Sequence, residues 1–389
     1  MARRSGAAGG AALAGILLVA STLAVLMSRP TAALSDEELT LNATVGSGGG
    51  GGGKLAFDYH AVSCPHLVTI VRAYVQTAVR GDATITPGLL RIHFHDCFPQ
   101  GCDASILLAG PSREWGPAGM PANANLNLRA MQLIERIRAH VHAVCGATVS
   151  CADITAVATS EAVYASGGPL YGVPLGQMDS FAPAHPRFIG TLPAPSTADV
   201  NRLHGAFCGK GLCDLADLVA LSGAHTVGYA HCPAFQDRRQ DDAFGQQLQM
   251  NCRRNPSWAQ ILDMFTPYRF DNGYFFAVFY GNGVLTSDMA LRGDPRTAQL
   301  VRAYAGNQAA FFQQFARSMQ KLSYAPKPQG NVGEIRRFSC FRSNNGRYGA
   351  DIADVTVATA DEVSAGATDN VVDVSAVADE GSAGATASA

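Results

Sequence analysis

The sequence carries little charge. Only 15% of the residues are Asp, Glu, Lys or Arg, and the formal net charge at pH 7 is −2. A chain of this kind lacks the basic surface that would bind nucleic acid or an anionic membrane. Internal repeats are also absent, and few segments alternate as a β-strand does. The sequence therefore predicts a mainly α fold, and its 389 residues suffice for one large domain or two smaller ones.

The N-terminus has the pattern of a targeting segment. Two arginines precede an apolar run over residues 7–27, and small residues suited to cleavage come after it. This pattern predicts a secretory signal peptide over residues 1–33. An uncleaved signal anchor is the alternative, because about 20 apolar residues can span a bilayer. The ten cysteines, an even number, also fit an oxidising compartment.

Two further segments are predicted to lie outside the compact domain. Residues 34–54 include six consecutive glycines and predict a flexible linker, and Asn42 within it begins the only glycosylation sequon. After Cys340 the chain has two arginines, eight acidic residues and hardly any aromatic residues, which predicts a disordered tail over residues 346–389. That tail fits a sorting extension, for example to the vacuole, or an inert end. The domain is then expected over residues 55–345.

Helical periodicity dominates this domain. Apolar residues recur at positions i, i+3 and i+4, and Gly or Pro marks several ends. Ser196 and Thr197 are expected to cap a helix that runs to Phe207. The other expected helices cover residues 67–78, 131–144, 151–166, 215–222, 273–280 and 297–322.

The stretch over residues 87–105 combines an apolar helix with polar side chains. Arg91 and His95 are four residues apart, so they share one face of the helix. A cation beside an imidazole costs desolvation energy in a core, which makes the pair a candidate for function. Asp96, Asp103 and Ser105 come next, with the oxygen donors that a hard cation prefers.

Two other interpretations of this stretch remain open. A buried histidine is often only a hydrogen-bonded structural residue, and His93 keeps that interpretation because it faces away from His95. A metal site made of His93, His95, Cys97 and Cys102 is the second interpretation. An oxidising compartment argues against it, because the two thiols would be joined in a disulfide.

A second constellation lies downstream. It is the stretch over residues 217–228, in which His225 comes just after the strongly apolar helix expected over residues 215–222. Together with residues 87–105, this stretch resembles the proximal and distal haem motifs of the class III (secretory plant) haem peroxidases. The resemblance runs in order from about Phe57 to about Cys340. It implies a two-lobed helical fold with haem b in the crevice between the lobes, and oxidation of donors by hydrogen peroxide.

The resemblance also implies roles on the proximal side and at the haem edge. His225 matches the axial ligand of the haem iron, and Asp288 matches the carboxylate that accepts from its other ring nitrogen. Such an acceptor fixes the tautomer and makes the ligand more basic. Pro193 matches the residue next to the donor substrate at the haem edge.

On the distal side, the resemblance implies the groups that act on peroxide. His95 matches the general base and acid, and Arg91 matches the cation that stabilises negative charge on the breaking O–O bond. Asn125 matches the asparagine that fixes the tautomer of His95, and Asn123 is a rival two residues away. Phe94 matches the ring that shields the iron.

Two calcium sites are implied as well, both made of oxygen donors close together in sequence. The first site is assigned to Asp96, Pro99, Gly101, Asp103 and Ser105, with Glu114 in support through water. The second site is assigned to Thr226, Asp263, Thr266, Arg269 (through its carbonyl) and Asp271.

The family's four disulfides carry over as Cys64–Cys145, Cys97–Cys102, Cys151–Cys340 and Cys232–Cys252. Cys208 and Cys213 remain and are expected to pair with each other. The segment between Glu114 and Asn125 is a few residues longer than the family pattern, and the loop between Cys232 and Cys252 is shorter.

A third departure concerns a buried charge. The family has two arginines where Gln177 and Met178 stand, and the first of them pairs with the buried aspartate that Asp153 matches. Asp153 is therefore expected to lack its cation, and Gln177→Arg is expected to stabilise the protein.

The sequence as a whole predicts a secreted, monomeric haem peroxidase of the cell wall or apoplast. Its partners would be hydrogen peroxide and small phenolic donors, oxidised in one-electron steps, with no stable membrane association. Removal of hydrogen peroxide under oxidative stress and cross-linking of lignin or cell-wall phenolics are the expected uses. A non-enzymatic, disulfide-braced extracellular protein on the same scaffold is the rival hypothesis, favoured by Gln177 and Met178.

Overall fold

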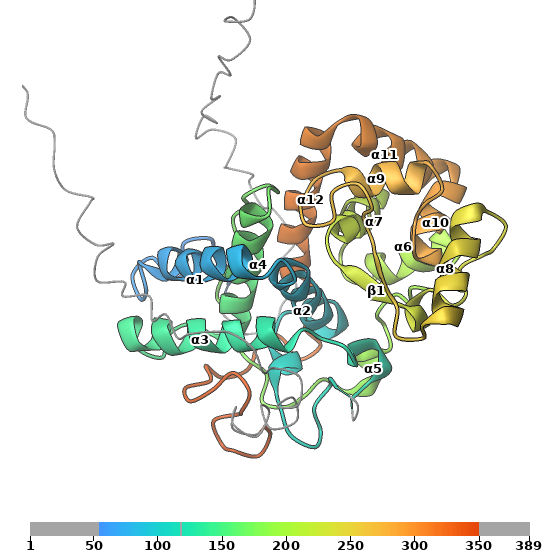
Figure 1. Ribbon diagram of the computed structural model, residues 1–389. Helices are drawn as coiled ribbons and strands as arrows, with labels where there is room; N and C mark the ends of the chain where they lie inside the picture. The colour runs from blue at the N-terminus through green and yellow to red at the C-terminus, as the bar shows by residue number, and fades with distance from the viewer. Residues whose placement is uncertain (1–53, 117–118, 350–389) are drawn as a thin grey trace, which may run out of the picture. The chain divides into compact units, whose positions relative to one another are not determined.

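The computed structural model describes residues 54–116 and 119–349 (Figure 1). The predicted signal peptide, the glycine run with Asn42, and the tail beyond residue 349 lie outside the described residues. The described chain is mainly helical, as predicted. Its α-helices are α1 (Leu67–Gly81), α2 (Ile85–Gln100), α3 (Leu128–Cys145), α4 (Cys151–Ala165), α5 (Pro186–Ile189), α6 (Val200–Cys208), α7 (Leu215–Ser222), α8 (Ala243–Arg254), α9 (Gly273–Phe279), α10 (Thr286–Gly293), α11 (Pro295–Gly306) and α12 (Gln308–Ser323).

One hydrophobic cluster joins α1, α3 and α4 with part of α2. In α1 the predicted apolar stripe is buried at Leu67, Ile70, Val71 and Val75, because these positions lie on one face of the helix. Helix α4 is buried on every side from Cys151 to Val163, between the helices that surround it. Its polar residues, Asp153 and Glu161 among them, are buried too and therefore need partners.

A second cluster joins α7, α9, α11 and α12 and is rich in aromatic residues. The rings of Phe270 and Phe311 stack with centroids 5.8 Å apart, and Phe275 meets Phe311 edge to face at 4.8 Å. Helix α2 packs against α4 of the first cluster and against α12 of the second. It therefore carries the residues of the stretch 87–105 to the boundary between the two clusters (Figure 1).

Two expected helices differ in the structure. The segment expected to form one helix over residues 297–322 is two helices, because Asn307 leaves the helical conformation and accepts a hydrogen bond from the Ala310 amide as the cap of α12. Helix α6 begins at Val200 and is capped by Asp199, which accepts from the Asn201 amide; Ser196 and Thr197 lie before it. In both places a side-chain cap decides the boundary.

The only strands among the described residues are two short ones. β1 (Tyr229–His231) pairs antiparallel with β2 (Ala259–Ile261), with Tyr229 opposite Ile261. This pairing fastens the chain just after His225 to the segment before Asp263. The few strands expected from the sequence are therefore confirmed.

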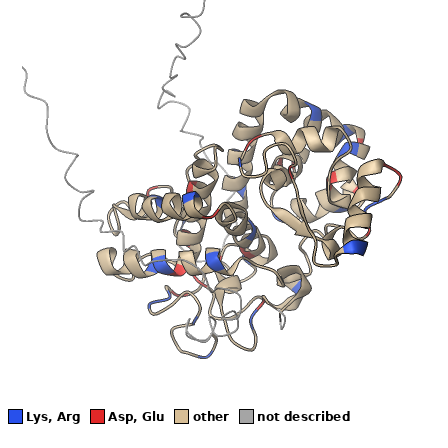
Figure 2. Cartoon of the chain, viewed as in Figure 1, with Lys and Arg blue, Asp and Glu red and all other residues tan. Residues whose placement is uncertain are grey.

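Five disulfides brace the described chain. They are the four pairs implied by the resemblance, Cys64–Cys145, Cys97–Cys102, Cys151–Cys340 and Cys232–Cys252, together with Cys208–Cys213. Charged residues are sparse and scattered over the described elements (Figure 2). No helix in the described part of the chain has both the length and the apolar character needed to cross a membrane.

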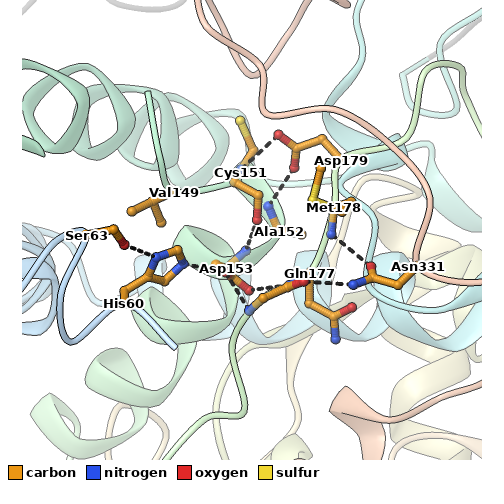
Figure 3. A network of polar contacts seen from close by, with 12 residues as sticks. His60, Ser63, Val149, Cys151, Ala152, Asp153, Gln177, Met178, Asp179 and Asn331 are labelled. Carbon is orange, nitrogen blue, oxygen red and sulfur yellow. Dashed lines mark hydrogen bonds and ion pairs between the residues drawn. The ribbon is translucent and has the colours of Figure 1, made fainter. Parts of the chain in front are cut away.

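Asp153 has a partner that the sequence did not predict (Figure 3). His60 Nε2 lies 2.8 Å from its Oδ2, and the amides of Gly176 and Gln177 donate to it at 2.9 and 3.1 Å. The side chain of Gln177 donates instead to the Ser323 carbonyl at 2.7 Å. The expectation of an unpartnered Asp153 is therefore wrong, because the His60 imidazole is its side-chain partner. Gln177→Arg is no longer expected to stabilise the protein, since Asp153 already has a partner.

Removal of this imidazole should destabilise the protein. We expect His60→Phe to cost about 2 kcal/mol of unfolding free energy, because a buried carboxylate would keep only its two amide donors. Ser63→Ala is the matched control: Ser63 is exposed and 3.0 Å from the other ring nitrogen, so its loss should cost less than about 1 kcal/mol. Denaturant melts of the two variants check this, and equal stabilities would contradict it.

Candidate active site

Helix α2 presents three of the predicted distal residues near its middle. Leu89 and Ile92 are fully buried and anchor the helix, while Phe94 and His95 are half-buried and Arg91 is exposed. Arg91 and His95 lie one turn apart, as predicted from their spacing. The Phe94 ring packs against Phe98 with centroids 4.8 Å apart, which fixes it beside His95.

The partner of His95 is Asn123. Its Oδ1 lies 2.7 Å from Nδ1 of the imidazole, and Asn123 is fully buried at the end of a short 3₁₀ turn over Pro121–Asn123. Because a carbonyl oxygen only accepts, Nδ1 carries the proton and Nε2 keeps a free lone pair. The assignment of this role to Asn125 is therefore wrong. The longer segment after Glu114 shifts the alignment by two residues, and Asn123 takes the place.

Asn125 contributes its backbone instead. Its carbonyl accepts from Arg91 Nη1 at 3.1 Å, and the Ala122 carbonyl accepts from Nη2 at 3.0 Å. One loop thus orients both the imidazole and the guanidinium. Burial, aided by the charge of Arg91, lowers the pKa of His95 to about 3, against the opposing effect of the hydrogen bond with Asn123. His95 is therefore neutral near pH 7 and able to accept a proton.

His225 sits in a 3₁₀ turn, Gly223–Thr226, at the end of α7. A Cβ at Gly223 would lie 2.5 Å from the Phe311 ring and 2.8 Å from Phe275, so only glycine lets this turn pack so closely on the aromatic cluster. His225 Nδ1 lies 3.0 Å from Asp288 Oδ1, as predicted for this pair. The Nε2 side of the ring is left for another partner.

Asp288 is itself held firmly. Tyr274 donates its hydroxyl to Oδ1 at 2.9 Å, and the Leu285 amide donates to Oδ2 at 3.2 Å. Burial of the imidazole acts to lower the pKa of His225, but the charge of Asp288 and its hydrogen bond outweigh burial, so the pKa is raised. An imidazole held in this way is a strong electron donor, suited to a metal ion.

The two histidine sites lie on neighbouring elements. Helix α2 packs against the turn that carries His225, and the charge of Arg91 acts on His225 to lower its pKa. Pro193 is half-buried in a loop whose Pro195 carbonyl accepts from the Ser287 amide at 2.9 Å, next to Asp288. An imidazole donor on one side and a base with a cation on the other are what a haem peroxidase site needs.

The first predicted calcium group is a cluster of buried carboxylates. Asp96, Asp103 and Glu114 are 2%, 8% and 2% exposed. Burial raises the pKa of all three, that of Glu114 to about 7, and the charge of Asp103 adds to the shift at Asp96 and Glu114. Asp96 Oδ1 and Glu114 Oε2 have no hydrogen-bond partner among the described residues. These buried, unpartnered oxygens fit a divalent cation.

The second predicted group also converges. Thr226 Oγ1 lies 2.8 Å from Asp263 Oδ2 and 3.4 Å from Asp271 Oδ1, and Thr266 Oγ1 lies 3.2 and 2.8 Å from the same two oxygens. Asp263 is fully buried. Arg269 lies on the same loop, with its guanidinium 3.8 Å from Asp271. Two carboxylates and two hydroxyls within contact distance are a donor set for calcium.

The alternative metal site at α2 is not formed. His93, Cys97 and Cys102 do lie together, with Cys97 Sγ 3.6 Å from His93 Nδ1. The two sulfur atoms are joined in a disulfide and are not available as thiolate ligands. His93 is buried, and its ring contacts Cys97.

Comparison with known proteins agrees with this geometry. The sequence model of the family described as Peroxidase matches residues 71–307. The chain is 43% identical to "Cationic peroxidase SPC4" of Sorghum bicolor, over 72% of this chain and 80% of the relative. It is 40% identical to "Peroxidase 22.3" of Oryza sativa subsp. japonica, over 75% and 92%, and 38% identical to "Peroxidase 12" of Arabidopsis thaliana, over 72% and 81%.

The chain belongs to the peroxidase family. It is a plant haem peroxidase of class III, an enzyme that uses hydrogen peroxide, and the resemblance inferred from the two histidine motifs is confirmed. Sequence reasoning missed two residues of this peroxidase that the structure places at the site, Asn123 as the partner of His95 and Tyr274 as a donor to Asp288, and it missed His60 as the partner of Asp153 elsewhere in the fold. Only Asn123 left a signal, as the named rival of Asn125.

Asn123 and Asn125 provide a matched pair of variants. We expect Asn123→Ala to slow the reaction with hydrogen peroxide by roughly 10–100-fold, because the imidazole loses the acceptor that fixes its tautomer and orientation. Asn125→Ala should stay within a few-fold of the parent, because Asn125 acts through its carbonyl. Stopped-flow absorption at the Soret band measures both rates, and the opposite ranking would restore the Asn125 assignment.

Proposed function

We propose that this peroxidase is secreted and oxidises small phenolic donors by one-electron steps at the expense of hydrogen peroxide. The pairing of His225 with Asp288, opposite His95 and Arg91, is the observation that carries the proposal. In the overall reaction one hydrogen peroxide takes up two electrons and two protons from two donors and leaves as two waters. Haem b, when bound between the two sides, supplies the redox-active iron for this exchange.

His225 would hold the haem through Nε2, since Nδ1 is committed to Asp288. Asp288 draws the Nδ1 proton toward itself and raises the electron density on the ring. Tyr274 of α9 and the Leu285 amide at the start of α10 hold the Asp288 carboxylate in place. The carboxylate in turn fixes the orientation of the His225 ring. Phe94 would cover the opposite side.

His95 would move the proton. Its Nε2 lone pair accepts a proton from hydrogen peroxide and returns it to the departing oxygen, so that water rather than hydroxide leaves. Arg91 stands one turn away and stabilises the negative charge that develops on that oxygen. Both side chains are held by the segment 122–125, so their geometry does not depend on the substrate.

The two oxygen clusters would each hold a calcium ion. In the first, Asp96, Asp103 and Ser105 offer side-chain oxygens and Pro99 and Gly101 offer carbonyls, with Glu114 nearby. In the second, Thr226 comes directly after His225, so a cation there would fix the proximal turn.

Donors would approach the haem edge by Pro193. Five disulfides support an oxidising, extracellular location, and a monomer would suffice, because every proposed site residue lies in one chain.

Haem binding is the direct test of the proximal assignment. The purified protein should take up haem and give a ferric high-spin Soret spectrum, because His225 would be the single side chain that ligates the iron. His225→Ala should lose this spectrum unless free imidazole is added to replace the ligand. A folded parent protein that takes up no haem would end the proposal.

Distal variants test the chemistry. We expect His95→Leu to slow the reaction with hydrogen peroxide by several orders of magnitude, since both proton transfers pass through this ring. Arg91→Leu should cost less, about 10²–10³-fold, as for removal of one donor to a developing oxyanion. Single-turnover rates at saturating haem decide this, with phenol oxidation measured in parallel. Either variant near the parent rate would refute the assigned role.

A further inference from the structure

Two of the chain's four lysines stand at the first calcium group. Lys210 donates from Nζ to the Pro99 carbonyl at 2.8 Å, and its ammonium lies 5.6 Å from the centre of the Phe98 ring. The side chain of Lys327 packs against Gly101, so closely that a Cβ on Gly101 would collide with Lys327 Cγ. Gly101 also has a φ of +86°, which favours glycine at this position. Both residues assigned to bind calcium through carbonyls thus contact a lysine.

The charge of Lys327 reaches the carboxylates of the site. Among the charges that act on this half-buried lysine, those of Asp103 and Asp96 are the largest, ahead of Asp153 and Asp179. Its ammonium is fixed by Asn331, whose Oδ1 accepts at 2.8 Å. Asn331 in turn donates to the Gly176 carbonyl at 2.7 Å, so it ties Lys327 to the segment where two arginines were expected (Figure 3).

Lys210 is held by separate means. The Cys208–Cys213 disulfide closes the loop that carries it, and Leu212 of that loop is fully buried in the aromatic cluster. The ammonium is therefore a fixed donor at the Pro99 carbonyl. A calcium ion bound by that oxygen would meet a positive charge on the same atom, and the two would repel one another.

We propose that Lys327 and Lys210 weaken calcium binding at the site of Asp96, Asp103 and Ser105, so that this site exchanges calcium under conditions in which the same donors alone would retain it. With calcium gone, Lys327 balances part of the negative charge of Asp96 and Asp103. With calcium bound, both ammonium groups oppose it. The inference rests on the proposed calcium assignment of this site and adds what controls its affinity.

Loss of calcium here would reach the distal histidine. The Glu114 carbonyl accepts from the Met120 amide at 3.0 Å, and the Met120 carbonyl accepts from the Asn123 amide at 2.8 Å. A Cβ at Gly119 would collide with the Glu114 backbone, so these segments are in close contact. The position of Asn123, and with it the tautomer of His95, depends on the calcium loop.

The test measures release of calcium from the calcium-loaded holoenzyme into an excess of a fluorescent chelator. We expect Lys327→Met to slow release from one of two calcium ions by about tenfold or more, since the charge of Lys327 acts on both Asp96 and Asp103 and would repel a divalent ion held by them. Lys210→Met should slow the same phase by a smaller factor. Lys327→Arg keeps the charge and should release calcium within about threefold of the parent.

Two internal references make the result decisive. Lys54→Met removes an exposed lysine far along the chain from these donors and should change nothing, and the phase from the site of Asp263 and Asp271 should be the same in every variant. Asp103→Asn should abolish the affected phase. One outcome would contradict the lysine inference alone. In that outcome Asp103→Asn loses one calcium ion, which supports the calcium site, but Lys327→Met releases the same ion at least as fast as the parent protein. A parent protein with no calcium to release would overturn both.

Discussion

The structure depends on helix α2, which must carry polar side chains through the boundary of two hydrophobic clusters. Leu89 and Ile92 belong to one cluster and Leu90 to the other, so most of the helix lies away from solvent, and Arg91 is its one exposed residue. Each polar group therefore needs a partner. Arg91 finds two carbonyls, His95 finds Asn123, and Asp96 accepts from the Asp103 and Ala104 amides at 3.1 and 3.0 Å. The atoms that remain unpartnered are those that can react or bind: His95 Nε2 on the free side of the ring, and Asp96 Oδ1.

The same need for partners explains how the interior tolerates its carboxylates. Asp179 accepts from three backbone amides. The positive charge of the fully buried Arg336 opposes the effect of burial, which raises the pKa of Asp179. Asp153 takes His60 and two amides in place of an arginine. Lys327 then serves several of these carboxylates at once. One half-buried lysine shared by several carboxylates costs less desolvation free energy than a separate buried cation for each of them. Through its charge, Lys327 acts both on Asp179 and on the carboxylates Asp96 and Asp103.

Local pattern and spacing were enough to predict many of the helices and the shared face of Arg91 and His95, whereas the pairing of His225 with Asp288 and of the family's cysteines was implied by the family resemblance. Helices α1, α3, α4, α7 and α9, the pair Arg91 and His95, the pair His225 and Asp288, and all five disulfides agree with the structure. Prediction failed where the outcome depends on the path of a loop. Asn123 and Asn125 have the same chemistry, and only the 3₁₀ turn over Pro121–Asn123 decides which side chain reaches the imidazole. His60 lies 93 residues from Asp153, and no periodicity connects them.

The coupling between calcium loop and distal histidine is also a product of the fold alone. Glu114 is bound at both ends: its Oε1 accepts from the Ala184 amide at 2.6 Å, and its carbonyl holds Met120. Burial raises the pKa of Glu114 and the charge of Asp103 adds to this, while hydrogen bonds with Ala184 and Ser105 and the charge of Arg336 oppose it. Glu114 is therefore in contact with the oxygen cluster and also begins the segment that ends at Asn123. The buried carboxylates and the partner of His95 therefore lie on one continuous stretch of backbone, held together by the hydrogen bonds of Glu114 and Met120.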